Sequence, residues 1–431
     1  MKHAMLTAAL AAAMLTACSP QEYGAQPSRA QLDWHDLEYY MFCHFGPNTF
    51  TDVEWGDGTE DPDVFAPESL DCRQWARIAR DAGMKAIIIT AKHHDGFCLW
   101  PSSYSTHTVA QSAWRGGRGD VLAELSEACR EEGLLFGVYI SPWDRNHPDY
   151  GTAAYNDVFA GTIREVHTAY GPVFEQWFDG AGGQDAKNKG MPYDWARFNA
   201  TVHEVSPQAV IFSDVGPGCR WVGNERGYAG ETNWAALDVE GFTPGLNAPP
   251  LDTLNRGNVH GACYVPAECD VSIRPGWFYS PSTDDKVKSV EQLMDIWFGS
   301  VGRGGNLLLN VPPDRRGMIH PADSARLMEF KAAREAFLAG AVGSASREGR
   351  AVKVPSGHEV SAVVVCEDIA RGQKISSFVV EGMKDGRWSV LAEGTTVGHK
   401  RILRFEPCSC EKVRVRVTGS YGRSRISYTV I

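Results

Sequence analysis

Short apolar runs alternate with amphipathic stretches along the chain from about residue 35 to residue 310. Met84–Thr90 contains three consecutive isoleucines and is typical of a buried strand. Asp71–Ala82, which precedes it, has apolar residues at helical spacing and is followed by Gly83, a residue type that often ends helices. This alternation of strand and helix indicates βα units that contribute to one parallel sheet.

The same alternation recurs in further units. The expected strands are Glu38–Gly46, Met84–Thr90, Leu134–Ser141, Val173–Phe178, Ala209–Asp214 and Asn306–Val311. The expected helices are Asp71–Ala82, Val121–Glu132, Asn156–Tyr170, Tyr193–Val205 and Val287–Val301. Signals between residues 224 and 287 are weaker, so strands there are placed only loosely.

Six or seven clear units in about 280 residues fit an α/β fold, a (β/α)8-type TIM-like barrel over residues 35–340. A doubly wound open sheet is the alternative architecture. The chain has no G-x-G-x-x-G after the first strand and no Walker motif, which argues against nucleotide chemistry.

Residues 341–431 have a different pattern, which follows an expected helix at Pro321–Ala339. Short alternating runs such as Ile375–Val380 and Val413–Val417 occur there, and glycines separate several of them. Short strands at this spacing predict a C-terminal antiparallel β-sandwich.

The N-terminus predicts export. An apolar run at residues 4–15 is too short to span a bilayer and indicates a signal peptide over residues 1–17. Leu15–Cys18 resembles a bacterial lipobox, in which Cys18 carries the lipid, and residues 18–34 would form a polar tether. We therefore expect a lipid-anchored protein in the periplasm or on the surface of a Gram-negative bacterium, attached to the outer membrane. An ordinary signal peptide with a chance cysteine is the alternative.

Charge and composition indicate which classes of molecule the protein could bind. A formal net charge of −11 without a basic stripe argues against nucleic acid. Thirteen tryptophans and fourteen tyrosines supply flat surfaces of the kind that cover sugar rings. Ten cysteines beyond Cys18 show no CxxC pair, so we expect mostly free, buried thiols, although an exported protein could pair some.

Polar clusters follow four of the expected strands, at residues 42–49, 92–97, 139–144 and 177–180. The carboxyl ends of barrel strands meet at one mouth, so these side chains should converge. Asp179 lies between Phe178 and Gly180 at such an end, which suits a glycosidase nucleophile. A carboxylate that merely caps the next turn is the alternative interpretation.

Four segments carry a family resemblance: His44–Gly46, Lys92–Phe97, Trp177–Gly180 and Gly304–Asn310. Their order and spacing resemble glycoside hydrolase family 29, the α-L-fucosidases, over roughly residues 35 to 340. The resemblance implies a retaining exo-hydrolase that releases terminal L-fucose from a fucosylated oligosaccharide or glycoconjugate without a cofactor. It also implies that Asp179, in the Trp-Phe-Asp-Gly motif, is the nucleophile.

The general acid/base is harder to assign, because its position varies between subgroups of this family. Candidates are Glu54, Glu225, Glu231 and Glu268. The loop that carries Glu225, 46 positions after Asp179, resembles that of the subgroup that prefers α-1,3/1,4-linked fucose on branched, Lewis-type glycans. We therefore expect Glu225 to be the acid/base, with Glu231 and Glu268 as the main alternatives.

The remaining expected contacts bind substrate. We expect His44, His93 and His94 to hydrogen-bond fucose hydroxyls. The alternatives are that they pack in the core or that they bind zinc. Because the sequence offers no third ligand at a suitable spacing, we expect no metal. The other expected contacts are Glu54, Trp55, Tyr139, Glu268 for a branch galactose, and Trp297 for the fucose methyl group. Two rival functions remain, a metal-dependent barrel hydrolase and a non-catalytic glycan-binding lipoprotein.

Overall fold

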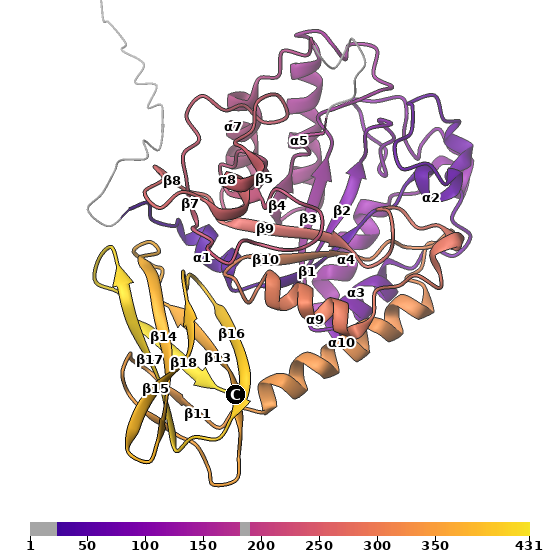
Figure 1. Ribbon diagram of the computed structural model, residues 1–431. Coiled ribbons are helices and arrows are strands. Elements are labelled where there is room, and N and C mark those ends of the chain that lie inside the picture. The colour runs from indigo at the N-terminus through magenta and orange to yellow at the C-terminus, as the bar shows by residue number, and fades with distance from the viewer. Residues whose placement is uncertain (1–23, 182–189) are drawn as a thin grey trace, which may run out of the picture.

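The computed structural model describes residues 24–181 and 190–431 (Figure 1). The expected signal peptide and the lipid-bearing Cys18 lie outside these residues. Within them, a closed barrel is followed by two antiparallel sheets, which appear in yellow at the lower left of Figure 1. This confirms the predicted fold class.

Eight parallel strands close the barrel in the order β1-β10-β9-β6-β5-β4-β3-β2. They are β1 (Tyr39–Cys43), β2 (Ala86–Lys92), β3 (Leu135–Ile140), β4 (Val173–Trp177), β5 (Val210–Ser213), β6 (Cys219–Trp221), β9 (Ala267–Ser272) and β10 (Asn306–Asn310). Closure comes from parallel pairing of β1 with β10, in which Tyr39 lies opposite Leu307 and Phe42 opposite Asn310.

Helices cover the outside of the barrel (Figure 1). They are α1 (Arg29–His35), α2 (Pro47–Thr51), α3 (Cys72–Asp81), α4 (Val121–Glu132), α5 (Tyr155–Tyr170), α7 (Trp195–Val205), α8 (Leu251–Arg256), α9 (Val290–Gly299) and α10 (Pro321–Ala339). Short 3-10 turns occur at η1 (Pro62–Val64), η2 (Trp114–Gly117) and η3 (Pro281–Thr283). Asp71, Asp120 and Asp194 cap α3, α4 and α7, because each side chain accepts a hydrogen bond from a backbone N–H in the first turn.

Two barrel strands, β6 and β9, were not predicted from the sequence pattern. β6 is only three residues long and follows β5 after a five-residue connection without a helix. β9 carries Glu268 and Asp270, both buried, on alternate positions of the strand. Carboxyl groups at these two positions break the apolar run by which the other strands are recognised.

The N-terminal helix is part of the barrel structure. Gln31 donates from its side-chain amide to the carbonyls of Gly218 and Tyr264, at 2.7 Å each. Trp34 donates from its indole N–H to Glu175 inside the barrel, at 2.9 Å. Residues 29–34 of the polar tether expected over residues 18–34 therefore belong to α1, which folds against the barrel.

The C-terminal region forms a sandwich of two four-stranded sheets, ordered β11-β18-β13-β16 and β12-β17-β14-β15. Its strands are β11 (Gly343–Ala345), β12 (Val352–Lys353), β13 (Val360–Glu367), β14 (Ile375–Lys384), β15 (Arg387–Gly394), β16 (Arg401–Cys408), β17 (Lys412–Ser420) and β18 (Ile426–Val430). Alternate residues of β13 and β14 contribute a separate apolar core, which accounts for the alternating sequence pattern.

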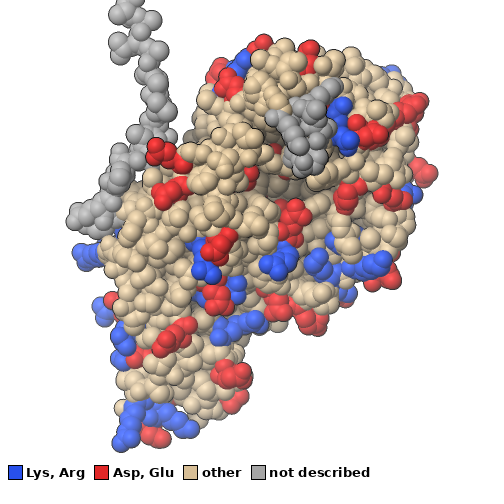
Figure 2. Space-filling model, turned by 45° about the horizontal axis from the view of Figure 1, so that its top comes forward, with Lys and Arg blue, Asp and Glu red and all other residues tan. Residues whose placement is uncertain are grey.

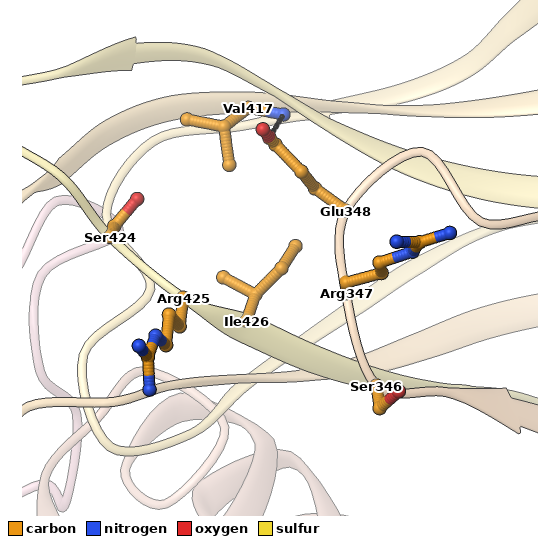
Figure 3. A pocket seen from close by; sticks show the side chains of 7 residues that line it. All are labelled: Ser346, Arg347, Glu348, Val417, Ser424, Arg425 and Ile426. Carbon is orange, nitrogen blue, oxygen red and sulfur yellow. Dashed lines mark hydrogen bonds between the residues drawn. The ribbon is translucent and has the colours of Figure 1, made fainter.

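A small cavity of about 290 Å³ opens between the sandwich loops (Figure 3). Val417 and Ile426 face each other across it, and Glu348 accepts a hydrogen bond from the backbone N–H of Val417 at 3.2 Å. Arg347 and Arg425 extend from its rim on opposite sides (Figure 3). No aromatic ring lines this cavity in the described chain, so it lacks the flat face on which sugars stack.

Loops on the barrel tie it to the sandwich. Asn233 donates from its backbone N–H to the Thr396 hydroxyl at 2.9 Å and accepts from the Gln373 amide at 2.9 Å. Arg401 donates to the carbonyl of Glu231 at 2.8 Å. Acidic and basic side chains are interspersed over much of the molecular face in Figure 2.

Nine cysteines are free thiols and six of these are buried, which confirms that expectation for most of the chain: Cys43, Cys72, Cys98, Cys129, Cys219, Cys269, Cys366, Cys408 and Cys410. Among the helices of residues 24–181 and 190–431, none is both long enough and apolar enough to cross a membrane.

Candidate active site

The polar residues at the carboxyl ends of the strands line one cavity of about 540 Å³ at the mouth of the barrel. Its described lining includes eight of the ten expected catalytic and substrate-binding residues: His44, Glu54, Trp55, His93, His94, Tyr139, Asp179 and Glu225. The other described lining residues are Phe42, Trp177, Gly180, Ala181, Phe212, Asp214, Trp221, Asp270 and Trp277. The mouth therefore gathers side chains from most of the barrel strands.

Asp179 follows β4 and is held from two sides. Tyr139, at the end of β3, donates its hydroxyl to Asp179 Oδ2 at 2.7 Å. The backbone N–H of Ala181 donates to Asp179 Oδ1 at 2.6 Å. With 21% of its side chain exposed, Asp179 presents a fixed carboxylate to the cavity.

Three histidines line the same cavity as Asp179 and are uncharged at neutral pH. Burial lowers the pKa of His44 to about 3 and that of His94 to about 4, although Asp179 opposes the shift of His94. Burial also lowers the pKa of His93 well below its usual value. The contact of 3.6 Å between His94 Nε2 and Asp179 Oδ2 is therefore a contact with a neutral ring rather than an ion pair.

Neighbouring groups fix the orientation of two of these rings. His44 Nδ1 lies 2.9 Å from the side-chain oxygen of Asn310 on β10, and His94 Nδ1 lies 2.8 Å from the Ser141 hydroxyl. His93 Nδ1 is buried without a partner, while its ring stacks on Tyr139 at 5.7 Å. Oriented neutral imidazoles can both donate to and accept from sugar hydroxyls.

Aromatic rings form much of the cavity wall. Trp177 stacks on Phe212 with ring centroids 3.9 Å apart and on Tyr139 at 5.2 Å. Trp55, half exposed at the rim, meets His94 edge to face at 5.6 Å. Trp277 lies 5.0 Å from His44. Such surfaces suit the apolar faces and methyl group of a deoxy sugar.

The described lining contains five carboxyl groups and neither lysine nor arginine. Burial, with the nearby charge of Asp179 as a lesser cause, raises the pKa of Asp214 to about 6. Burial also raises the pKa of Asp270 well above its usual value, assisted by Glu225 and Glu268. Burial, and to a lesser extent repulsion between the carboxyls, favours their protonated forms, which is the condition a general acid requires.

Glu225 lies at the exposed rim of this acidic cavity. Partial burial is the largest cause of its raised pKa, a hydrogen bond from the Trp277 side chain lowers it, and the charge of Asp179 raises it. Burial raises the pKa of Glu54, which accepts hydrogen bonds from the backbone of Trp277 and Phe278. Glu231 pairs with Arg303, is 76% exposed and lies outside the cavity.

The structure does not bring Glu268 to the cavity wall. Its side chain is fully buried inside the barrel, where Trp177 donates to Oε1 at 2.8 Å and Tyr40 donates to Oε2. It shares a hydrogen bond with Glu175, and burial raises the pKa of both carboxyls. Glu268 therefore holds the Trp177 ring by a hydrogen bond from inside the barrel and does not face a second sugar.

Trp297 likewise lies away from the cavity. It is buried on α9, where its ring packs against Phe298 at 5.2 Å and Phe337 at 5.9 Å. The expected contact with the fucose methyl group is therefore replaced by packing between helices α9 and α10.

One cluster of possible metal ligands occurs in the described chain, formed by Glu175, Cys219 and Glu268. It lies inside the barrel and apart from the cavity lining. Its carboxylate oxygens already accept hydrogen bonds from Trp34, Trp177, Tyr40 and the Cys219 thiol. These donors leave the cluster poorly suited to a cation.

Sequence reasoning missed Asp214 and Asp270 among the lining carboxyls. Asp214 ends a strand that was predicted correctly, so its position at the carboxyl end of β5 was a usable signal. Asp270 lies on β9, which the weak pattern between residues 224 and 287 concealed.

Comparisons with known proteins point to one family. The family model described as alpha-L-fucosidase matches residues 20–332. Alpha-L-fucosidase 1 of Arabidopsis thaliana is 41% identical over 422 residues, which cover 88% of this chain and 81% of that protein. A glycoside hydrolase 29 family member from an unknown rumen bacterium is 40% identical, with a TM-score of 0.85 and coverage of 95% and 77%. A Ruminococcus gnavus GH29 fucosidase in complex with fucose is 28% identical, with a TM-score of 0.85 and coverage of 96% and 95%.

A closed barrel with carboxyl groups, neutral histidines and aromatic walls at its mouth suits a glycoside hydrolase. With the family match over most of its length, the chain belongs to the α-L-fucosidases, glycoside hydrolase family 29.

Tyr139→Phe tests the support of Asp179. The change keeps the ring that stacks on Trp177 but removes the hydroxyl donated to Oδ2. A hydrogen bond to a charged group contributes about 1.5–3 kcal/mol, so we expect kcat/KM for an aryl fucoside to fall roughly tenfold to a hundredfold.

Tyr170→Phe is the matched control, because Tyr170 donates to Asp120 at the same 2.7 Å on the outside of the barrel. It should leave kcat/KM unchanged. An equal loss in both variants would mean that Tyr139 acts only through stability.

Proposed function

We propose that the chain is a retaining exo-α-L-fucosidase in which Asp179 attacks the anomeric carbon and Glu225 is the general acid/base. The observation that supports this most strongly is that both carboxyls line one cavity whose described lining contains neither lysine nor arginine. Tyr139 and the Ala181 N–H fix Asp179, while Glu225 lies at the rim, where the leaving oxygen would emerge.

The two groups differ in the way that double displacement requires. Asp179 accepts two hydrogen bonds that hold its carboxylate in one orientation. Glu225 has a raised pKa and so holds its proton to higher pH. In the first step Asp179 forms the covalent fucosyl ester while Glu225 protonates the leaving oxygen. In the second step Glu225 deprotonates water, which releases L-fucose with retained configuration.

Asp179→Asn tests the nucleophile. The amide is nearly isosteric, so the fold should persist, but it cannot form the ester. We expect turnover of an aryl fucoside to fall by several orders of magnitude. Asp295→Asn, on the exposed outer surface of α9, serves as the control and should retain full turnover. Near-normal turnover in a folded Asp179→Asn variant would exclude Asp179 from the mechanism.

Glu225→Ala tests the acid/base. Substrates with poor leaving groups should lose most, because activated aryl fucosides need little protonation. Loss of the titrating acid should also remove the fall of wild-type kcat/KM at high pH, since that fall reports deprotonation of the acid in the free enzyme.

Added azide should replace the deprotonated water, restore part of the turnover and give a fucosyl azide of unchanged anomeric configuration. Equal loss on all substrates, without rescue by azide, would assign the role to another carboxyl of the cavity.

The proposal extends to linkage. The loop after β6 resembles that of the subgroup acting on α-1,3/1,4-linked fucose, and buried Arg220 anchors its start through bonds to the carbonyls of Leu254 at 2.8 Å and Trp234 at 3.0 Å. Trp221 and Trp277 remain in the cavity lining as aromatic faces for a second sugar. Export with a lipid on Cys18 completes the proposal and rests on the residues of the N-terminus alone.

Lewis-type trisaccharides should therefore be cleaved far faster than fucosyl-α-1,2-galactose or aryl fucosides. The aromatic faces of Trp221 and Trp277 lose their contacts when the second sugar is absent, which lowers kcat/KM for the simpler substrates. Comparison of kcat/KM for the three substrates is the measurement. Equal rates would leave the family unchanged but would refute the subgroup and its argument for Glu225.

A further inference from the structure

A compact loop at residues 241–247 lies beside the catalytic cavity. Thr243 and Asn247 pair through two backbone hydrogen bonds of 2.9 and 3.0 Å, and the Asn247 amide donates to the carbonyl of Gly241 at 3.0 Å. These bonds close the loop on itself, so its tip has a defined position.

The loop is hydrogen-bonded to the end of β5 and closely approaches the end of β4, which carries the proposed nucleophile. The Gly245 N–H donates to the two carboxylate oxygens of Asp214, at 3.3 and 3.1 Å. A Cβ atom added to Gly245 would lie 3.1 Å from the carbonyl oxygen of Gly180, the residue after Asp179, and its φ of +70° also disfavours a side chain. Gly245 is therefore a position where two backbones approach closely.

Leu246, the next residue, is 81% exposed, the most exposed of the large apolar side chains in the described chain. A single exposed leucine is ordinary on a protein surface. Here, however, the backbone next to it is bonded to Asp214, which lines the cavity, while Leu246 itself lies outside the lining. An apolar group is thus held just beyond the rim.

The order of the strands indicates which part of the substrate lies near the loop. Asp179 follows β4, Asp214 follows β5 and Glu225 follows β6, and these three strands are neighbours in the barrel. A leaving oxygen protonated by Glu225 lies between the ends of β4 and β6. A sugar attached to that oxygen can extend outward past the end of β5, where Asp214 and the loop lie.

We propose that the loop at residues 241–247 is a wall of the leaving-group site, in which Leu246 packs on the apolar face of the sugar that departs from fucose. This inference rests on the function proposed above. Asp214 is the positioning residue, since it holds the loop at the rim, and Leu246 determines specificity by favouring a carbohydrate leaving group over a small one.

The test compares two substrates that share fucose and differ in the leaving group. α-L-Fucosyl fluoride releases only fluoride, whereas a Lewis-type trisaccharide releases a sugar. In Leu246→Ser, the ratio of kcat/KM for the trisaccharide to kcat/KM for the fluoride should fall roughly tenfold, as expected when an apolar contact is lost. Most of the loss should appear in KM for the trisaccharide, because the contact exists in the ground state as well.

Two further variants sharpen the result. Leu251→Ser changes another exposed leucine, at 60%, on α8 and should leave the ratio at its wild-type value. Gly245→Ala should lower the ratio in the same direction as Leu246→Ser, since the added Cβ displaces the loop from Gly180.

An unchanged ratio in Leu246→Ser, or an equal fall in Leu251→Ser, would overturn the inference while leaving the proposed hydrolase intact. Failure of the wild-type protein to hydrolyse either fucosyl substrate would instead refute the proposed function itself.

Discussion

The pairing of β1 with β10 is the constraint on which the site depends. These strands are separated by more than 260 residues of sequence, yet their parallel ladder turns an open sheet into a barrel with a single mouth. The pairing also brings Asn310 to His44, whose ring it orients at 2.9 Å. Without closure, the strand ends that carry His44, Tyr139 and Asp179 would face solvent along an edge rather than one another.

The mouth that results is electrostatically unusual. Five carboxyl groups line it without a lysine or arginine in the described lining, and its three histidines are neutral because they are buried. This arrangement is unfavourable at rest, since the carboxyls repel each other. The same carboxyl groups become stabilising when positive charge develops on a sugar ring, because they are already positioned to interact with that charge. The environment that raises the pKa of Glu225 would thus also stabilise an oxocarbenium-like transition state.

The barrel and the sandwich could be predicted from the sequence because most of their strands are apolar or alternate regularly, as in β2 and β13. β9 could not, because inward-facing Glu268 and Asp270 interrupt its apolar pattern. Tertiary contacts also explain why two predicted substrate-binding residues, Glu268 and Trp297, lie outside the cavity lining. Glu268 looked like a binding residue because it is charged, yet tertiary hydrogen bonds from Tyr40 and Trp177 hold it inside the barrel. Trp297 looked like a sugar contact because it precedes a barrel strand, yet its helix turns the ring toward Phe337.

The junction between barrel and sandwich has a consequence for how such chains can be recombined. The segment that follows Glu225 is fastened to the sandwich, because the backbone of Glu231 and Asn233 is bonded to Arg401, Thr396 and Gln373. The C-terminal sheets therefore help shape the catalytic half of the molecule, although they contribute no residue to the described cavity lining. Evolution and protein engineering alike must exchange the two parts together, or rebuild the contacts between them, since a barrel transplanted alone would lose the hydrogen bonds that hold the segment after Glu225.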